Sequence, residues 1–400
     1  MDERIWKVVE SWNFWKEGPE TGVPREVVKQ AWPFTKGPEA VYFYGPRRAG
    51  KTFVCYQILD KLSKKFGRKS CLYINFEEPS FSTRLNTRFI TDIVECFTTV
   101  FGRKPKFIFL DEVQNVPQWE KWVRATVDKK EYKVFVTGSS AKLLSTEFST
   151  SLGGRGVGFM VLPFSYREFR VARPGAGFED YLEMGGYPAV VLEADKRKRT
   201  RLLEEYFETA IARDITGRYD VRDVQTLKTL AVYTLTNSGK LFSYNKLRGM
   251  TGLSFDALRD YLSYLEGAFM VFSAPSFSYS LKKAMQKPRK YYAYDVGLKS
   301  AVSKSYSRDF GRNAENSVAI ELVRRGWEPQ YYSNDYEVDF VVKEGLQLRA
   351  INVSYAGHPP PRERSSLEKF RSEHSMSSTL LLDKKGLEEW MLRTIPFPYS

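Results

Sequence analysis

The sequence is poor in the residues that most metal centres and many catalytic triads need. Its 400 residues contain two histidines, His358 and His374, and three cysteines, Cys55, Cys71 and Cys96. The cysteines lack the spacing of metal ligands, so neither a zinc site nor a histidine-based triad is expected. We interpret the thiols as buried groups of a reducing compartment.

Long apolar runs are also missing. No stretch of about eighteen apolar residues runs without charge, so no membrane span is expected. The first residues, MDERIWK, mix acids with bases and lead into no apolar stretch, so no signal peptide is visible. The sequence therefore predicts a soluble, cytoplasmic protein. A hydrophobic fraction of 42% can build ordinary cores, and the length suggests two or three domains.

Positive charge is in excess and is unevenly distributed. The formal net charge is +14, with a pI of about 9.4. Between Val221 and Phe310 there are fourteen Lys and Arg against six Asp and Glu, a surplus of eight. Such a surplus suits an anionic partner, nucleic acid before others, although charge does not determine the fold.

One short stretch, VYFYGPRRAGKTFVCYQ, contains a phosphate-binding motif. Gly45, four further residues and Gly50-Lys51-Thr52 fit G-x-x-x-x-G-K-[ST]. An apolar strand-like run precedes the motif, and FVCYQILDKL after it has apolar residues at helical spacing. Backbone N–H groups of the loop and of the helix N-terminus would bind phosphate oxygens. The expected nucleotide-binding residues of this stretch are Gly45, Pro46, Arg47, Arg48, Ala49, Gly50, Lys51, Thr52 and Phe53.

Strand-like and helix-like segments alternate after this loop. Strands are expected at Val41–Tyr44, Cys71–Phe76, Phe107–Leu110 and Lys133–Thr137, and a helix at Trp119–Val127. Such alternation predicts an α/β domain with a parallel sheet, which binds its ligand at the carboxyl ends of the strands.

Two acids, Asp111 and Glu112, directly follow the third of these strands. An acid at the end of a buried strand needs a partner, and beside a phosphate loop that partner is Mg²⁺. Thr52 and Asp111 are therefore the expected metal ligands, Lys51 the cation on the β- and γ-phosphates, and Glu112 the base that orients water. Ser139, in TGSS, either contacts the γ-phosphate or, like Ser140, caps a helix.

Together these segments resemble a known family. The set GPRRAGKT, FIFLDEVQNVPQWEKWV, VFVTGSSAKLLSTEFSTSLGGR and VLPFSYREF is similar to AAA+-type ATPases of archaea and bacteria that carry a C-terminal domain of obscure function. The resemblance implies that Asp111 and Glu112 are the Walker B pair and that Ser139 is at the sensor position. Arg155 becomes a candidate catalytic arginine finger or sensor, or else only pairs with its own loop. A finger acting in trans would require self-association.

The expected nucleotide is ATP, with ADP as the product. The single Asn-Lys dipeptide, Asn245-Lys246, is not followed by the Asp of the guanine-specific N-K-x-D motif.

The basic middle region predicts a winged helix. A short helix at Phe242–Met250, a turn at Thr251–Leu253, an N-cap at Ser254 and a second helix give a helix-turn-helix plan. The apolar Met270–Phe272 and the stretch LKKAMQKPRKYYAY behind it are the expected wing. The residues expected to be exposed on the whole module are Lys246, Arg248, Arg259, Lys282, Lys283, Lys287, Arg289 and Lys290. They would contact the phosphates of DNA, or else the module packs internally as a switch over the nucleotide.

The C-terminal region resembles the restriction-endonuclease-like fold often found in this family, in which an Asp and a Glu-x-Lys pair hold Mg²⁺. Asp339 matches the first acid and Glu315 a helix acid, but Asn352-Val353-Ser354 stands at the Glu-x-Lys position. An amide is a poorer ligand than a carboxylate for a hard cation, and Ser354 cannot supply an ammonium group. We therefore expect a degenerate site that has lost cleavage.

The predicted organisation has four parts. These are a P-loop (AAA+-like) ATPase domain at 1–175, a helical, lid-like connector at 176–220, a winged-helix domain at 221–308 and a degenerate nuclease-like α/β domain at 309–400. The leading hypothesis is an ATPase that works on DNA or switches its contact with DNA. The alternatives are a nucleotide-controlled protein–protein switch or scaffold without DNA, and an active Mg²⁺-dependent nuclease.

Overall fold

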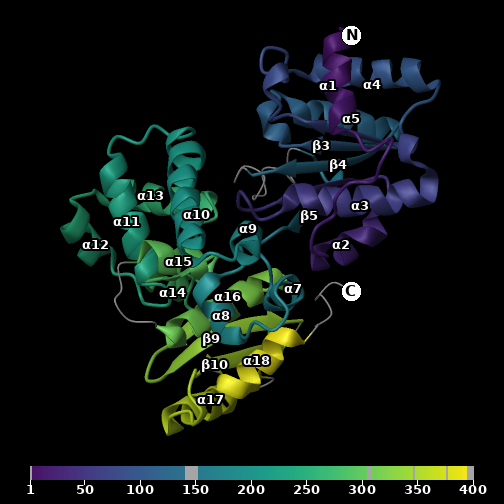
Figure 1. Cartoon of the computed structure of the whole chain (residues 1–400). Coiled ribbons are helices and arrows are strands. Elements are labelled where there is room, and N and C mark those ends of the chain that lie inside the picture. The colour runs from purple at the N-terminus through teal and green to yellow at the C-terminus, as the bar shows by residue number, and fades with distance from the viewer. Residues whose placement is uncertain (1, 140–151, 304–308, 346, 375–376, 394–400) are drawn as a thin grey trace. The chain divides into compact units, whose positions relative to one another are not determined.

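The structure, a computed structural model, describes residues 2–139, 152–303, 309–345, 347–374 and 377–393 (Figure 1). The chain folds into two compact units, Met1–Val161 and Leu162–Ser400. Among the described residues, no helix combines the length and apolar character that a membrane span requires.

The first unit is built on a five-stranded sheet in the order β2-β3-β4-β1-β5. All neighbouring strands are parallel. The strands are β1 (Ala40–Tyr44), β2 (Cys71–Asn75), β3 (Phe107–Asp111), β4 (Lys133–Gly138) and β5 (Gly156–Met160). The predicted parallel α/β sheet is thus confirmed. The sequence GVGFM of β5 was not predicted as a strand, because its two glycines have weak strand propensity.

Helices cover both faces of this sheet, as Figure 1 shows. On one face lie α1 (Glu3–Trp12), α4 (Thr87–Phe101) and α5 (Trp119–Lys129), whose apolar side chains share a core with the strands. On the other face lie α2 (Glu26–Ala31) and α3 (Lys51–Phe66). Burial on both faces explains why these strands are continuous apolar runs rather than alternating ones.

Short 3₁₀ turns join several of these elements: η1 (Trp32–Thr35), η2 (Arg68–Ser70), η3 (Pro79–Phe81) and η4 (Val113–Asn115). The three cysteines are free thiols; Cys55 and Cys71 are buried and Cys96 is partly buried.

The second unit begins with helices. They are α7 (Tyr166–Ala172), α8 (Phe178–Met184), α9 (Pro188–Leu192), α10 (Lys196–Thr209), the π-helical segment η6 (Ala210–Thr216), α11 (Val224–Thr236), α12 (Tyr244–Thr251) and α13 (Phe255–Gly267). Between α12 and α13 the chain turns at Gly252, whose φ of 69° favours glycine. Ser254 caps α13 by accepting a hydrogen bond from the Ala257 N–H, as its position in the sequence predicts.

An antiparallel hairpin follows these helices. Its strands are β6 (Val271–Ala274) and β7 (Lys290–Ala293), with α14 (Leu281–Gln286) in the connection. The strands pack on the core that α11, α12 and α13 share, and α15 (Val296–Val302) completes that core.

The rest of the chain forms a mixed sheet in the order β11-β10-β9-β8, with helices around it. The elements are α16 (Phe310–Arg324), β8 (Gln330–Ser333), β9 (Glu337–Glu344), β10 (Gln347–Val353), α17 (Pro361–Glu373), β11 (Ser377–Leu382) and α18 (Lys384–Leu392). Strands β8, β9 and β10 are antiparallel neighbours, and β11 runs parallel to β10.

Candidate functional site

The phosphate loop connects β1 to α3 through backbone conformations that require glycine. Gly45 has a φ of 147°, and a Cβ there would lie 2.2 Å from the Val161 carbonyl oxygen. Gly50, with a φ of 94°, directly precedes the first helical residue, Lys51. The first N–H groups of α3, which have no acceptor within the helix, therefore face the loop, which is the geometry that binds anions.

Lys51 lies inside the loop that it closes. Its side chain is buried, with 4% of the residue exposed. The Nζ atom donates to the carbonyl oxygens of Gly45, at 3.1 Å, and of Pro46, at 2.9 Å. Because these acceptors are neutral, they can be exchanged for the stronger, charged acceptors of a phosphate group.

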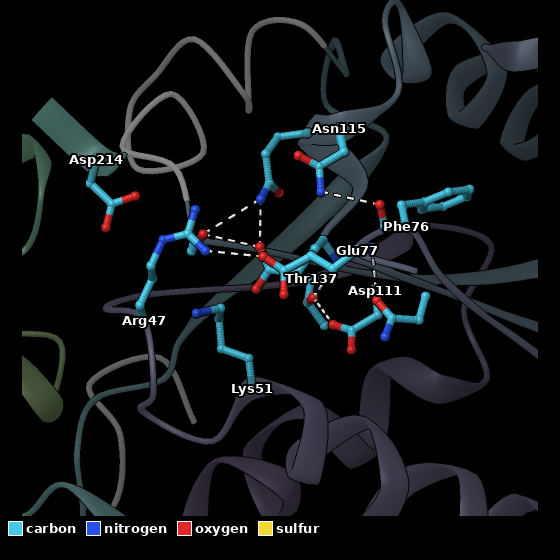
Figure 2. Close-up of polar contacts among 12 residues, drawn as sticks. Arg47, Lys51, Phe76, Glu77, Asp111, Asn115, Thr137 and Asp214 are labelled. Carbon is cyan, nitrogen blue, oxygen red and sulfur yellow. Dashed lines mark hydrogen bonds and ion pairs between the residues drawn. The ribbon is translucent and has the colours of Figure 1, made fainter. Parts of the chain in front are cut away.

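Asp111, at the end of β3, accepts hydrogen bonds from three hydroxyl groups. Its carboxylate accepts from Thr52 Oγ1, at 2.8 Å, and from the Tyr73 hydroxyl. It also accepts from the Thr137 hydroxyl (Figure 2). Burial and then the negative charge of Glu112 raise the pKa of Asp111, while the three hydrogen bonds oppose that shift. Thr52 and Asp111 thus offer adjacent hydroxyl and carboxylate oxygens, which are ligands that Mg²⁺ prefers.

Glu112 is held in an unusual backbone conformation. Its φ of 52° and ψ of 47° lie in the left-handed region, which costs a residue with a Cβ roughly 1 kcal/mol. Its N–H donates to Thr137 Oγ1 at 3.0 Å, and its carboxylate accepts from Ser139 Oγ, also at 3.0 Å. The strain turns the side chain toward β4 rather than along β3.

The environment keeps Glu112 ionised. Burial alone would raise the pKa of this carboxyl group, but the positive charge of Lys51, the amide hydrogen of Gln114 and the charge of Arg47 outweigh burial and lower it. At neutral pH the group is a carboxylate, which is the form that a general base requires.

Other residues of the loop vary in exposure. Arg47 forms an ion pair with Glu77, at 3.1 Å, and Arg48 is exposed with a φ of 63°. Phe53 is 42% exposed. The buried Arg25, in the N-terminal segment, donates to the Ala49 carbonyl at 2.7 Å and so helps to hold the loop in its conformation.

Two expectations concern the chain after β4. Ser139 contacts Glu112, whereas Ser140 and the rest of residues 140–151 lie outside the described residues, so the helix-cap alternative stays a prediction. Arg155 forms an ion pair with Asp128, at 2.5 Å, and donates to the carbonyl of Gly153 in its own loop, at 3.3 Å. Any catalytic role of Arg155 would require that pair to open.

Sequence reasoning missed four side chains of this site. Tyr73 and Thr137 bind Asp111, Gln114 binds Glu112, and Arg25 supports the loop. A polar group inside an otherwise apolar strand was the available signal for Tyr73 and Thr137, because such a group needs a partner when it is buried.

In the second unit, the basic residues of the predicted winged helix differ in exposure. Exposed members are Lys246, Arg248, Arg259, Lys282, Lys283 and Arg289. Lys287 is partly buried and donates from Nζ to the Ser333 carbonyl at 2.7 Å.

The expectation that Lys290 is exposed was wrong. Only 3% of this residue is exposed, and its Nζ lies 2.8 Å from Glu337 Oε1 and 3.8 Å from Glu315 Oε1. Lys290 belongs to β7, all four residues of which are buried. Its ammonium group therefore compensates acids from β9 and α16 and is not available to DNA.

The residues of the predicted degenerate acidic site contact other groups of the same chain. Asn352 Oδ1 accepts from the Asp339 N–H at 3.1 Å, and its Nδ2 donates to Glu363 Oε2 at 2.9 Å. Asp339 accepts from the Val353 N–H at 2.8 Å, and burial together with the charge of Glu315 raises its pKa well above the usual value. Both ends of the Asn352 amide are thus occupied.

Ser354 and Glu315 also have partners within the chain. The Ser354 N–H donates to the Leu382 carbonyl at the end of the sheet. Glu315 accepts from the Tyr292 hydroxyl at 2.8 Å. Within the described part of the chain, no group of three or more His, Cys, Asp or Glu side chains is arranged to hold a metal ion.

The parallel sheet and the phosphate loop identify the first unit as a P-loop ATPase domain of the AAA type. A family model described as an AAA domain matches residues 37–170, and a domain of unknown function, DUF8612, matches residues 175–309. The chain is 31% identical over 347 residues to the uncharacterized protein MJ1544 of Methanocaldococcus jannaschii, covering 80% of this chain and 76% of that protein. It belongs to the same family of AAA-domain proteins. An AAA domain implies binding of ATP, with Mg²⁺.

A bacterial relative and solved structures extend the comparison. An uncharacterized protein of Haemophilus influenzae is 28% identical over 327 residues, covering 78% of this chain and 81% of the relative. The Walker-type ATPase PABY2304 of Pyrococcus abyssi superimposes with a TM-score of 0.47 and 14% identity, covering 72% of this chain and 99% of that chain. DnaA from Aquifex aeolicus gives 0.32 and 12%, with coverage of 60% and 86%.

Proposed function

We propose that the first unit binds Mg·ATP on Lys51, Thr52 and Asp111 and hydrolyses it with Glu112 as the base. The observation that carries the proposal is the convergence of these groups at the carboxyl ends of β1 and β3. The hydroxyl of Thr52 lies 2.8 Å from the Asp111 carboxylate, and Lys51 is enclosed by the loop. Mg²⁺ bound there would polarise the phosphates.

Each protein group has a defined task in this proposal. The loop N–H groups hold the phosphates, and Lys51 exchanges its carbonyl acceptors for phosphate oxygens. Glu112 accepts a proton from the attacking water. Ser139, already 3.0 Å from Glu112, is placed to report on the terminal phosphate. Arg155 would act only after leaving Asp128, in cis or in a second copy of the chain.

Glu112→Gln is the first test. The amide keeps the shape of the side chain but cannot accept the proton, so hydrolysis should slow at least about a hundredfold while ATP affinity stays close to that of the wild type. Phosphate release and equilibrium ATP binding measure the two quantities. Glu120→Gln, the same substitution on α5, is the matched control. Unchanged turnover in Glu112→Gln would place the base elsewhere.

For the second unit we propose a winged helix that contacts DNA phosphates, with ATP hydrolysis changing that contact. Supporting it are the two helices α12 and α13 around the Gly252 turn, the β6–β7 hairpin and the exposed basic residues. A nucleotide-controlled protein–protein switch is the competing proposal, and the internal contacts of Lys287 and Lys290 favour it. The contacts of Asn352 argue against nuclease activity.

Salt dependence separates these two proposals. If Lys282, Lys283 and Arg289 contact phosphates, replacing all three with alanine should flatten the slope of log K against log salt by roughly 0.9 per contact removed. Sequence preference and basal ATP hydrolysis should not change. The triple variant Lys64→Ala, Lys65→Ala and Lys69→Ala, which removes three exposed charges from the first unit, is the control. Titration of duplex DNA at several salt concentrations gives the slopes, and coincident slopes would exclude DNA contact by this surface.

A further inference from the structure

Gln114 contacts both Glu112, the expected base, and Ser139, the expected sensor of the terminal phosphate. It belongs to η4, two residues after Glu112. Its Nε2 donates to Glu112 Oε2, at 2.5 Å, and lies 3.4 Å from Ser139 Oγ. Since Ser139 Oγ also donates to Glu112 Oε2, the three side chains form one polar link between the ends of β3 and β4.

The other end of the same amide group has no partner. Among the described residues, Gln114 Oε1 is a buried oxygen without a hydrogen bond. Turning the amide over would not satisfy it, because an oxygen would then face the Glu112 carboxylate. A buried acceptor without a donor costs free energy, and such atoms in proteins are usually explained by a ligand or a water.

The chemistry of hydrolysis supplies a suitable donor. A water that attacks phosphorus uses one lone pair for the new bond and carries two hydrogens. One hydrogen goes to the base. If the other hydrogen also has an acceptor, the orientation of the water is fixed and its lone pair points at the phosphorus. Glu112 provides the first acceptor, and Gln114 Oε1 is the acceptor left over beside it.

We propose that Gln114 is a positioning residue for the attacking water: its amide N–H groups fix the Glu112 carboxylate, and its Oε1 accepts the second hydrogen of the water. The inference rests on the proposed ATP hydrolysis. In that reaction the water oxygen bonds to the γ-phosphorus, the bond from phosphorus to the β–γ bridging oxygen breaks, and Glu112 receives the proton. The second hydrogen leaves with the phosphate.

The split between kcat and ATP affinity distinguishes this role from simple support of the turn. A residue that aims the attacking water acts on the hydrolysis step and leaves ATP binding unchanged. A turn that had lost its structure would also displace the neighbouring Asp111 and Glu112 and would weaken the binding of Mg·ATP.

The test compares Gln114→Leu with the wild type and with Asn115→Ala. Asn115 belongs to the same turn but contacts the Phe76 carbonyl instead of Glu112. For Gln114→Leu we expect kcat to fall by about tenfold to a hundredfold and ATP affinity to stay within about twofold. Asn115→Ala should keep both kcat and ATP affinity. Should the leucine variant fail to fold, Gln114→Met, unbranched and of similar length, undergoes the same measurements.

The outcomes separate this inference from the proposed function. If the wild type hydrolyses ATP while the Gln114 variant retains its kcat, the role of Gln114 is wrong and the ATPase proposal stands. Loss of ATP binding in the variant, or an equal loss in Asn115→Ala, would show a structural role and overturn the inference. If the wild type does not hydrolyse ATP, both the role of Gln114 and the ATPase proposal are wrong.

Discussion

Replacing Lys51 with alanine is expected to abolish tight binding of ATP and to lower kcat/KM by about a thousandfold or more. The side chain is buried within the loop, and groups that stabilise charge on a transferred phosphate contribute factors of this size. Equilibrium binding of ATP in the presence of Mg²⁺ and the rate of phosphate release measure the two effects.

Lys65→Ala is the matched control for this variant. Lys65 is an exposed lysine on α3, the same helix, and lies in its last turn. Because Lys51 also holds the Gly45 and Pro46 carbonyls, thermal melting without nucleotide should be compared for both variants. Wild-type affinity in Lys51→Ala would show that the loop is not the nucleotide site.

The second large effect is expected from Lys290→Met. Methionine retains the length and apolar stem of lysine but removes the ammonium group that faces Glu337 and Glu315. Breaking a buried ion pair costs about 3–5 kcal/mol, and we expect about 3 because Glu337 is more than half exposed and can turn to water. For a unit of this size, that corresponds to a fall in melting temperature of about 6–12 °C.

The loss should depend on pH. Burial raises the pKa values of Glu315 and Asp339, and the charge of Lys290 opposes that shift. Without Lys290 both values rise further, so the folded variant gains relatively more stability as the acids become protonated. The destabilisation should therefore be largest at neutral and higher pH, and it should shrink as the pH falls through the folded-state pKa values of these acids.

Two further variants control this experiment. Lys282→Met makes the same substitution at an exposed position of α14 and should leave the melting temperature unchanged within about 1–2 °C. Glu315→Gln combined with Lys290→Met should cost less than the sum of the two single changes, because the charge left without a partner is removed. Melting curves that coincide for Lys290→Met and the wild type would contradict the buried ion pair.

Local patterns made the nucleotide-binding unit predictable. The phosphate loop, four of the five strands and the acids after β3 are each encoded within a few consecutive residues. The hydroxyl groups on Asp111 could not be assigned in the same way, because Tyr73 and Thr137 reach it from two other strands. Strand β5 was missed since its glycines give no strand signal.

For Lys290 the local sequence pattern led to a wrong prediction. In sequence it is one of five basic residues within nine positions, which is typical of an exposed, charged surface. Its burial depends on acids from α16 and β9, which lie later in the sequence, and no local pattern around Lys290 indicates them. The same reasoning missed Glu363, which occupies the Asn352 amide from α17.

The ion pairs of Lys290 bear on where this protein can be divided. A fragment ending near residue 308 would retain the lysine and lose both Glu315 and Glu337. Its ammonium group would then stand uncompensated in a strand that is otherwise apolar. The hairpin also loses the main-chain bonds that join Pro275 and Phe277 to Tyr331. Fragments meant to isolate the basic helices should therefore extend through the C-terminal sheet, because α16 and that sheet supply these partners of the hairpin.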